Sequence, residues 1–149
     1  MIPKLPVLLC ALTLATPVFA QTAIDGDTIK LDGTTYRLWG IDAPESKQAC
    51  GGWAAGADAT RTFVDLMKGK QIECEPKTTD RYGRTVAICR ADGADLGMAM
   101  VSAGMAWAFV RYSQDYVLQE SEAKLAGLGI HSHGCEPAWE WRARQRPKG

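Results

Sequence analysis

Residues 28–45 read TIKLDGTTYRLWGIDAPE, and this stretch sets the start of the fold. Thr28 to Leu31 and Thr34 to Ile41 have the composition and length of two short strands. Asp32-Gly33 lies between them and is a dipeptide typical of a two-residue hairpin turn. The stretch therefore predicts an antiparallel hairpin close to the N-terminus.

The remainder of the chain alternates short helical and strand-like segments. Ala59, Phe63, Leu66 and Met67 recur at helical spacing, and Asp95 is placed to cap a second helix. Five or so short strands with interspersed helices predict a small barrel in an α+β domain. Besides the hairpin, we expect helices at 54–68, from Asp95 to Gly104 and at 115–126, and strands at 71–75, 85–90 and 105–110.

Residues 1–20 have the pattern of an export signal. A weakly basic start precedes the apolar run Leu5 to Thr16, and Val18-Phe19-Ala20 fits a small-x-small cleavage site. The run is too short to span a bilayer. Cleavage at Ala15 is an alternative, as is an uncleaved anchor or a first strand. We expect one exported domain over 21–149, periplasmic or extracellular and free of the membrane after cleavage.

The charge of the chain is balanced, with 17 basic and 17 acidic residues. Removal of the signal would take away Lys4 and leave a slight acidic excess. A protein that coats nucleic acid regardless of sequence is usually basic. The balance instead suits a protein that holds its substrate through a local patch.

Four cysteines follow the predicted signal: Cys50, Cys74, Cys89 and Cys135. An even number in an exported chain predicts two disulfides, for which three pairings are possible. Cys74 and Cys89 lie symmetrically about Arg81-Tyr82, which favours placing them opposite each other on neighbouring strands. Cys50 would then pair with Cys135 and tie the C-terminal segment to the loop after the hairpin.

Three aspartates could form a metal site. Asp25 and Asp27 are two residues apart and share a face if the segment is a strand, and the hairpin brings Asp42 alongside. Carboxylate and carbonyl oxygens suit Ca²⁺ or Mg²⁺. Asp-Gly-Asp is also an ordinary turn sequence, and it does not start an EF-hand loop, because Tyr36 stands where that loop needs Glu.

Two arginines and a glutamate complete the set of candidate catalytic groups. Arg37 lies in an otherwise apolar strand, where a charge needs a partner. Glu45 follows Pro44 at the end of that strand and could orient or deprotonate a water molecule. Arg84 follows Tyr82-Gly83 in a turn, and two guanidinium groups could stabilise the charge on a phosphorus. The structural alternatives are a salt bridge for Arg37, a solvated carboxylate for Glu45 and a surface turn for Arg84.

The ordered set Asp-Gly-Asp-Thr at 25–28, Arg-Leu-Trp-Gly-Ile-Asp-Ala-Pro-Glu at 37–45 and Asp-Arg-Tyr-Gly-Arg at 80–84 resembles the staphylococcal-nuclease-like, or thermonuclease, family. The resemblance covers about residues 23–130. It implies a five-stranded OB-fold β-barrel with about three helices. It also implies a Ca²⁺-dependent phosphodiesterase that acts on DNA and RNA and leaves 3′-phosphates; we expect a monomer.

The resemblance also implies roles for the acidic residues. Asp27 and Asp42 would be Ca²⁺ ligands, with the Ala43 carbonyl as a third. Asp25 would hold these ligands in position without binding the cation itself. Ala43 stands where the family has threonine, so only its backbone oxygen is available. Glu45 would activate the attacking water.

The remaining roles concern the substrate. Arg37 and Arg84 would be the phosphate-binding pair, and Arg81, Tyr82 and Tyr112 would contact neighbouring parts of the nucleic acid. The loop after the second motif is shortened relative to the family. At a second position near the base, this chain has Val110 where relatives can have tyrosine. These departures bear on affinity and base preference.

The C-terminal segment is open to two interpretations. Trp139 and Trp141 precede alternating basic residues, which could form a stacking and phosphate-contacting tail. We favour aromatic packing on the barrel followed by a solvated, partly disordered end. His131 to Cys135 is interpreted as a loop held by a disulfide in preference to a metal site.

Two other functions are compatible with such a fold. A non-catalytic OB-fold module would bind nucleic acid or a partner through basic and aromatic surface. A secreted structural or inhibitory domain would use the same charges in salt bridges. The joint presence of Arg37, Asp42, Glu45 and Arg84 favours the nuclease.

Overall fold

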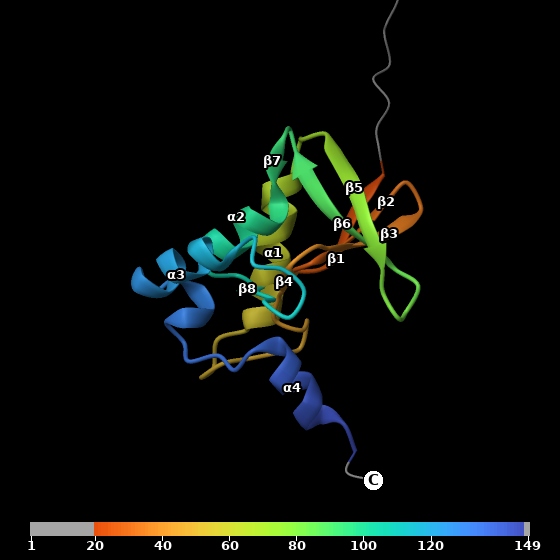
Figure 1. The fold of residues 1–149 in the computed structure, drawn as a ribbon. Coiled ribbons are helices and arrows are strands. Elements are labelled where there is room, and N and C mark those ends of the chain that lie inside the picture. The colour runs from red at the N-terminus through yellow and green to blue at the C-terminus, as the bar shows by residue number, and fades with distance from the viewer. Residues whose placement is uncertain (1–19, 148–149) are drawn as a thin grey trace, which may run out of the picture.

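The computed structural model describes residues 20–147, and these form a mixed α+β fold (Figure 1). The predicted export signal lies outside the described residues except for Ala20. No helix in the described part of the chain is both long and apolar enough to cross a membrane. The elements are β1 (Gln21–Asp25), β2 (Thr28–Leu31), β3 (Thr34–Leu38), β4 (Ile41–Asp42), α1 (Ala55–Met67), β5 (Ile72–Thr79), β6 (Thr85–Ala91), β7 (Ala94–Asp95), α2 (Leu96–Ser102), β8 (Trp107–Ala108), α3 (Val117–Leu125), the 3-10 helix η1 (Gly129–His131) and α4 (Ala138–Gln145).

The strands form two sheets. The larger has the order β1-β2-β3-β6-β5, with β7 paired to β6, and the smaller consists of β4 and β8. All pairs are antiparallel except β3 and β6, which run parallel. The α+β class is confirmed. The expected five-stranded barrel and three helices are not accurate, because these sheets do not close on each other and the described residues contain four α-helices.

The predicted strand over Thr34 to Ile41 is interrupted at Gly40. Gly40 has a φ of +70°, a left-handed conformation that glycine adopts without steric cost. A Cβ at this position would also lie 3.1 Å from the ring of Tyr116. The chain therefore turns out of the main sheet, and β4 pairs with β8 instead, with Asp42 opposite Trp107.

The hairpin and the second helix form as predicted. Asp32 and Gly33 have φ values of +48° and +86°, as a two-residue type I′ turn requires. Asp95 caps α2, since its side chain accepts a hydrogen bond of 3.0 Å from the Met98 N–H. Local turn and capping chemistry is thus sufficient to define these two elements.

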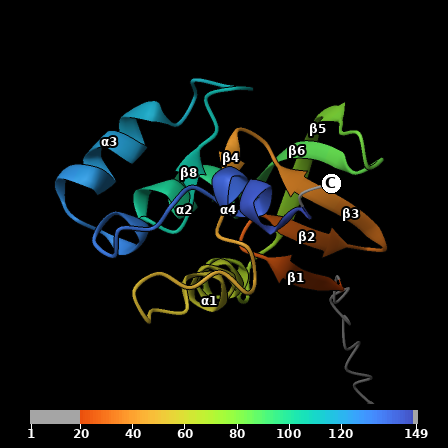
Figure 2. The ribbon, with the colours of Figure 1, turned by 90° about the horizontal axis from the view of Figure 1, so that it is seen from below.

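The main core lies between the sheet and α1, with α2 packed beside it. Phe63 of α1 is fully buried, together with Ile29, Leu38 and Met100 from the sheet and α2. In Figure 1 the large sheet lies on one side of the molecule, α2 and α3 lie on the other, and α4 lies below. Seen from below, α4 lies over β4 and β8 (Figure 2).

Both disulfides have the pairing that was expected. Cys74 and Cys89 lie opposite each other in the β5–β6 register and are bonded. Cys50, in the loop before α1, is bonded to Cys135, just before α4. The second bond therefore fixes the start of the C-terminal segment to the loop that follows β4.

The C-terminal segment differs from the solvated, partly disordered end that we favoured. Residues 138–145 form α4, whose first turn packs through Trp139. The Trp139 ring stacks on Phe109 at 5.3 Å and meets Trp107 edge-on at 6.2 Å. The aromatic packing was predicted, but the helix was not, because its contacts come from β8 and the following loop.

The disulfides should contribute unequally to stability. Cys50 and Cys135 are separated by 85 residues and Cys74 and Cys89 by 15. A cross-link that closes a longer loop removes more entropy from the unfolded chain, and the losses should be about 4–5 and about 3 kcal/mol in the chain-entropy model. Urea unfolding of the two paired Cys→Ser variants measures both. A larger loss of stability on removing the Cys74–Cys89 bond, which closes the shorter loop, would contradict the expectation.

Candidate active site

Arg37 lies at the centre of a buried charge cluster. Its side chain is 16% exposed, its Nη1 forms an ion pair with Asp27 Oδ1, and its Nη2 lies 2.7 Å from Asp42 Oδ1. The β2–β3 register pairs Thr28 with Arg37, which brings the neighbouring Asp27 within reach. The salt bridge considered for Arg37 is therefore present, and it joins both predicted metal ligands.

The two aspartates are held from several sides. Asp27 is 2% exposed and Asp42 fully buried. Asp27 Oδ2 accepts a 2.7 Å hydrogen bond from the Ala43 N–H, while the Thr28 hydroxyl donates to its Oδ1 at 3.1 Å. Gly26 permits this approach, because a Cβ there would lie 2.8 Å from that of Ala43. The Asp-Gly-Asp sequence thus serves packing as well as charge.

Asp25 and Asp27 have different proton affinities. Burial, together with the charge of Asp27, raises the pKa of Asp25 to about 6. Burial acts in the same direction on Asp27, but the Arg37 charge and the Ala43 N–H outweigh it and hold the pKa of Asp27 below its ordinary value. Asp27 is therefore ionised at neutral pH, while Asp25 gains a proton in mildly acidic solution.

Arg142 of α4 also belongs to this cluster, and sequence analysis did not place it there. Its Nη1 lies 2.6 Å from Glu45 Oε1 and 3.1 Å from Asp42 Oδ1, and its Nη2 lies 2.8 Å from Asp42 Oδ2. Burial lowers the pKa of Arg142, but these hydrogen bonds outweigh it and the net direction is upward. The only sequence signal was its spacing of three residues from Trp139, one helical turn.

Arg84 lies in the turn just before β6 and has a different partner. Its Nε is 2.7 Å from Asp80 Oδ2, and its backbone N–H donates to Asp80 Oδ1 at 3.0 Å. The parallel ladder pairs Arg37 with Val86, and Arg84 precedes Val86 by two residues. Arg84 itself lies outside this ladder, and it is bonded to Asp80 within its own turn.

The predicted substrate contacts lie on two exposed loops. Tyr82 and Tyr112 are 68% and 66% exposed. The guanidinium groups of Arg81 and Arg84 lie 4.9 and 5.5 Å from the centre of the Tyr82 ring, within cation–π range. Tyr112 packs beside Phe109, with ring centres 5.0 Å apart. Both rings are largely exposed to solvent, where a base could contact them.

The donor set near Arg37 suits a hard cation but is sparse. The described residues contain no group of three or more His, Cys, Asp or Glu side chains that could hold a metal ion. Asp27 and Asp42 converge on one guanidinium, so their oxygens face a common space. Ca²⁺ accepts six to eight oxygen ligands, which can include backbone carbonyls and water. The residues present are compatible with Ca²⁺ if carbonyl oxygens and water complete the shell.

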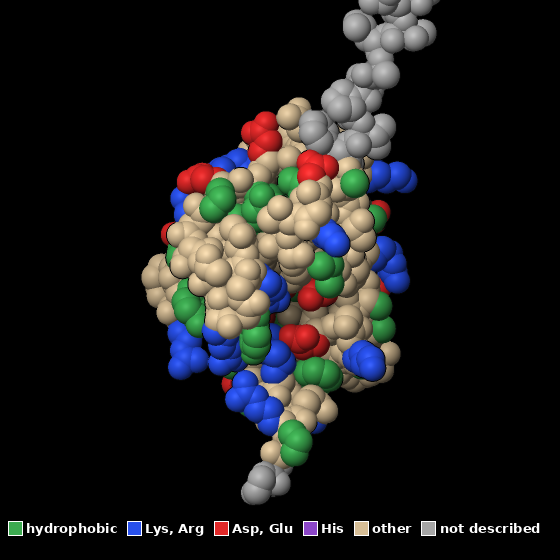
Figure 3. Space-filling view, turned by 90° about the vertical axis from the view of Figure 1, so that its right-hand side faces the viewer, with side chains coloured by type: hydrophobic (Ala, Val, Ile, Leu, Met, Phe, Trp, Pro, Cys, Tyr) green, Lys and Arg blue, Asp and Glu red, His purple; other side chains and the backbone are tan. Residues whose placement is uncertain are grey.

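The surface carries charges of both signs in close proximity. Figure 3 shows acidic side chains beside a hollow in the middle of one face, with Lys and Arg side chains around them and toward the C-terminal end. A polyanion could be held by the basic groups while the acids hold a cation.

Buried acids joined by arginine, with further arginines nearby, are groups that could act on a phosphate ester. A family model described as "Staphylococcal nuclease homologue" matches residues 35–133. The chain belongs to the staphylococcal nuclease family.

Curated relatives agree with this assignment. An uncharacterized endonuclease of Escherichia coli O157:H7 is 35% identical over 130 residues, 82% of each chain. A micrococcal nuclease of Shigella flexneri is 33% identical over 137 residues, which cover 80% of this chain and 76% of that protein. Protein ParB of Escherichia coli is 34% identical, with coverage of 90% and 86%.

Removal of the Arg37 guanidinium should strongly destabilise the protein. Arg37→Ala leaves Asp27 buried without its charged partner, and breaking a buried pair in this way costs about 3–5 kcal/mol. Arg61→Ala is a control, because the ion pair of Arg61 with Asp58 is largely exposed and should contribute under about 1 kcal/mol. Urea unfolding at neutral pH measures both losses, and equal losses would contradict the expectation.

The cost of Arg37→Ala should also depend on pH. The pKa of Asp27 is lowered in the folded protein, so its contribution to stability is present above the ordinary value of 3.8 and is lost as pH falls through the folded-state pKa. The difference in unfolding free energy between wild type and Arg37→Ala should therefore shrink as the pH falls below 3.8. A difference that stays constant or grows would show that Asp27 does not carry the effect.

Proposed function

We propose that this chain is an exported, Ca²⁺-dependent nuclease that hydrolyses phosphodiester bonds of DNA and RNA and leaves 3′-phosphates. The supporting observation is the convergence of Asp27 and Asp42 on Arg37, with Glu45 at the edge of the same cluster. Family membership and the names of the relatives, which include endonuclease and micrococcal nuclease, support the same reaction class.

The cation would be held by Asp27, Asp42 and the Ala43 carbonyl. Bound there, Ca²⁺ would supply a Lewis acid that polarises a phosphate oxygen. The lowered pKa of Asp27 keeps that ligand ionised. Asp25 would support the site by accepting the Asp27 N–H, a hydrogen bond of 3.1 Å.

The reaction would use three side chains around the phosphate. Glu45, at the mouth of the cluster and one-third exposed, would orient or deprotonate the attacking water. Arg37 and Arg84 would bind phosphate oxygens and stabilise the charge that develops in the transition state. Arg84 would have to exchange its Asp80 contact for the phosphate, and its 33% exposure leaves room for that exchange.

Substrate binding would rest on exposed groups outside the cluster. Arg81 would contact a neighbouring phosphate, while Tyr82 and Tyr112 would offer faces on which bases stack. Stacking accepts any base, which is compatible with action on both DNA and RNA. We expect the protein to act as a monomer.

Export is supported by the chain's chemistry. Two disulfides persist in oxidising compartments and are rare in the cytosol. Strand β1 begins at Gln21, immediately after the expected cleavage position at Ala20. Cleavage after Ala20 would leave all residues of β1 in place and remove one flanking hydrogen bond, which the Ala20 carbonyl accepts from the Asp32 N–H.

A second candidate function is binding of nucleic acid or a protein partner without cleavage. The exposed Tyr82 and Tyr112, with arginines beside Tyr82, are features that such an OB-fold module would use. Such a module would have no use for Glu45 at the mouth of a buried acidic cluster. The two functions are separated by a cleavage assay.

The cleavage assay uses plasmid DNA, single-stranded DNA and RNA, each with Ca²⁺ and with a chelator. We expect cleavage that depends on Ca²⁺, because the donor set near Arg37 consists of hard oxygens. End-group analysis should find 3′-phosphates on the products. Intact substrates under both conditions, together with a measurable binding affinity, would favour the non-catalytic module.

Glu45→Gln or Arg84→Ala should lower turnover about 10²–10⁴-fold, the range for loss of a general base or of a transition-state donor. Both side chains are partly exposed, so folding should change little. Glu122→Gln is a matched control on exposed α3 surface and should retain turnover. Wild-type rates from folded Glu45→Gln protein, verified by circular dichroism, would disprove the role given to Glu45.

A further inference from the structure

The Arg142 guanidinium forms hydrogen bonds with the carboxylates of Asp42 and Glu45, which the proposed reaction needs. Asp42 Oδ1 accepts from Arg37 and Arg142, and Asp42 Oδ2 accepts from Arg142. Glu45 Oε1 is engaged by Arg142 as well. A cation bound to Asp42, or a water molecule held by Glu45, would have to displace these hydrogen bonds. The structure therefore represents a closed arrangement of the site.

The closed arrangement is built into the packing of α4. Strand pairing places Asp42 opposite Trp107, and α4 lies across this pair. Trp139 and Arg142 are one helical turn apart and therefore share a face of α4. Trp139 meets Trp107 edge-on while Arg142 reaches Asp42. A single position of α4 therefore allows both contacts.

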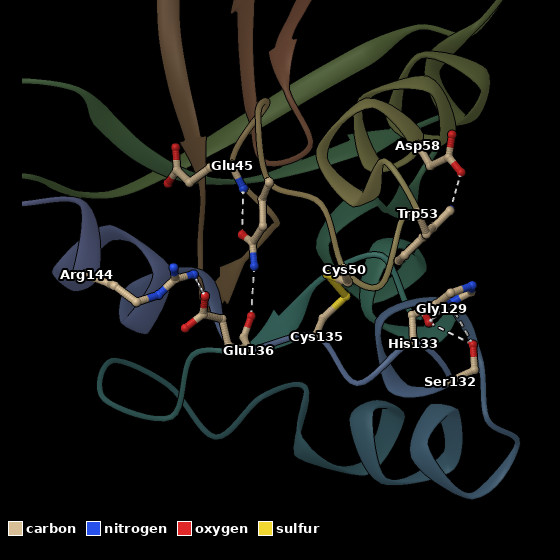
Figure 4. The surroundings of a disulfide bond; sticks show 11 residues. Glu45, Cys50, Trp53, Asp58, Gly129, Ser132, His133, Cys135, Glu136 and Arg144 are labelled. Carbon is tan, nitrogen blue, oxygen red and sulfur yellow. Dashed lines mark hydrogen bonds and ion pairs between the residues drawn. A yellow bond between two sulfur atoms is a disulfide. The ribbon is translucent and has the colours of Figure 1, made fainter.

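The start of this segment is fixed to the loop that carries Glu45. Figure 4 shows the bond from Cys50 to Cys135 and, beside it, the contacts of Glu136. The buried Gln48 donates to the Glu136 carbonyl at 2.8 Å and accepts from the Glu45 N–H at 3.2 Å. The tether keeps α4 near the site even when its own contacts break, so the local concentration of Arg142 stays high.

The contacts of Arg142 are nevertheless weak enough to exchange. Its side chain is 36% exposed and that of Glu45 is 33% exposed. The pair with Glu45 is therefore open to solvent and weak, whereas Asp42 is fully buried but keeps its pair with Arg37 when Arg142 leaves. A divalent cation presents twice the charge of a guanidinium to the same carboxylates, so it can compete for them. Withdrawal of the last turn of α4 is sufficient, since Cys135 and Trp139 lie before Arg142.

We propose that Arg142 is an internal counter-ion that competes with the divalent cation for Asp42 and Glu45, so that α4 acts as an autoinhibitory latch on the active site. This inference rests on the proposed function, since it assumes that the same carboxylates bind the cation. Free protein would favour the latched state, and cation with substrate would favour the open one. The tail would then set the Ca²⁺ concentration at which the enzyme becomes active.

The test measures Ca²⁺ affinity of the full mature chain by isothermal titration calorimetry without substrate. Arg142→Ala should lower the Kd for Ca²⁺ about tenfold, within the usual range for coupling between two competing interactions. The Ca²⁺-free variant should also melt at a lower temperature than wild type, while saturating Ca²⁺ should raise its Tm by more.

Two further variants separate the latch from a general charge effect. Arg146→Ala removes the same charge at the end of α4, where Arg146 is exposed and forms no ion pair within residues 20–147; its Kd should change about twofold or less because of screening. Trp139→Ala keeps Arg142 but removes its aromatic seat. Trp139→Ala should also lower the Kd for Ca²⁺, by a smaller factor than Arg142→Ala.

Each result of the titration decides the proposal. An unchanged Kd in Arg142→Ala would overturn it, and a weaker affinity would show instead that Arg142 positions the carboxylates for the cation. Ca²⁺ binding by Arg142→Ala but not by wild type would support the latch. Absence of Ca²⁺ binding in both proteins would overturn it. If only the nuclease proposal is wrong, wild type and Arg142→Ala will both bind Ca²⁺ but neither will cleave nucleic acid.

Discussion

The pairing of one arginine with two buried aspartates is the interaction on which the rest of this structure depends. Burying Asp27 and Asp42 costs free energy that only a close opposite charge can offset, and Arg37 supplies that charge. The pairing fixes β2, β3 and β4 relative to one another, because the three charges come from these strands or their ends. The same constraint produces a site in which ionised oxygens already converge before any ligand arrives.

The departure of β4 from the main sheet places this charge cluster beside α4. Gly40 breaks the strand, so Asp42 pairs with Trp107 of β8, beside the surface on which α4 lies. Glu45 follows at the mouth of the cluster, and Arg84 lies in the turn before β6.

The C-terminal segment connects the stability of the molecule to its proposed activity. The bond between Cys50 and Cys135 and the packing of Trp139 hold α4 in place, and Arg142 then meets the acids of the site. Arg37, Asp42, Glu45 and Arg84 lie within residues 35–133, the part of the chain that the family model matches. The Arg142 contact is an additional feature, and it suggests that activity depends on a balance between an internal and an external cation.

Local chemistry made much of this protein predictable from its sequence. The Asp32-Gly33 turn, the Asp95 cap and the spacing of the motifs were sufficient for the hairpin, α2 and the identity of Asp27, Arg37, Asp42 and Glu45 as one group. The break at Gly40, the additional helix α4 and the position of Arg142 were decided by tertiary structure. The physical reason is distance along the chain: Arg142 and Asp42 are 100 residues apart, and no local pattern encodes a contact that exists only after β8 and the disulfide have seated the helix.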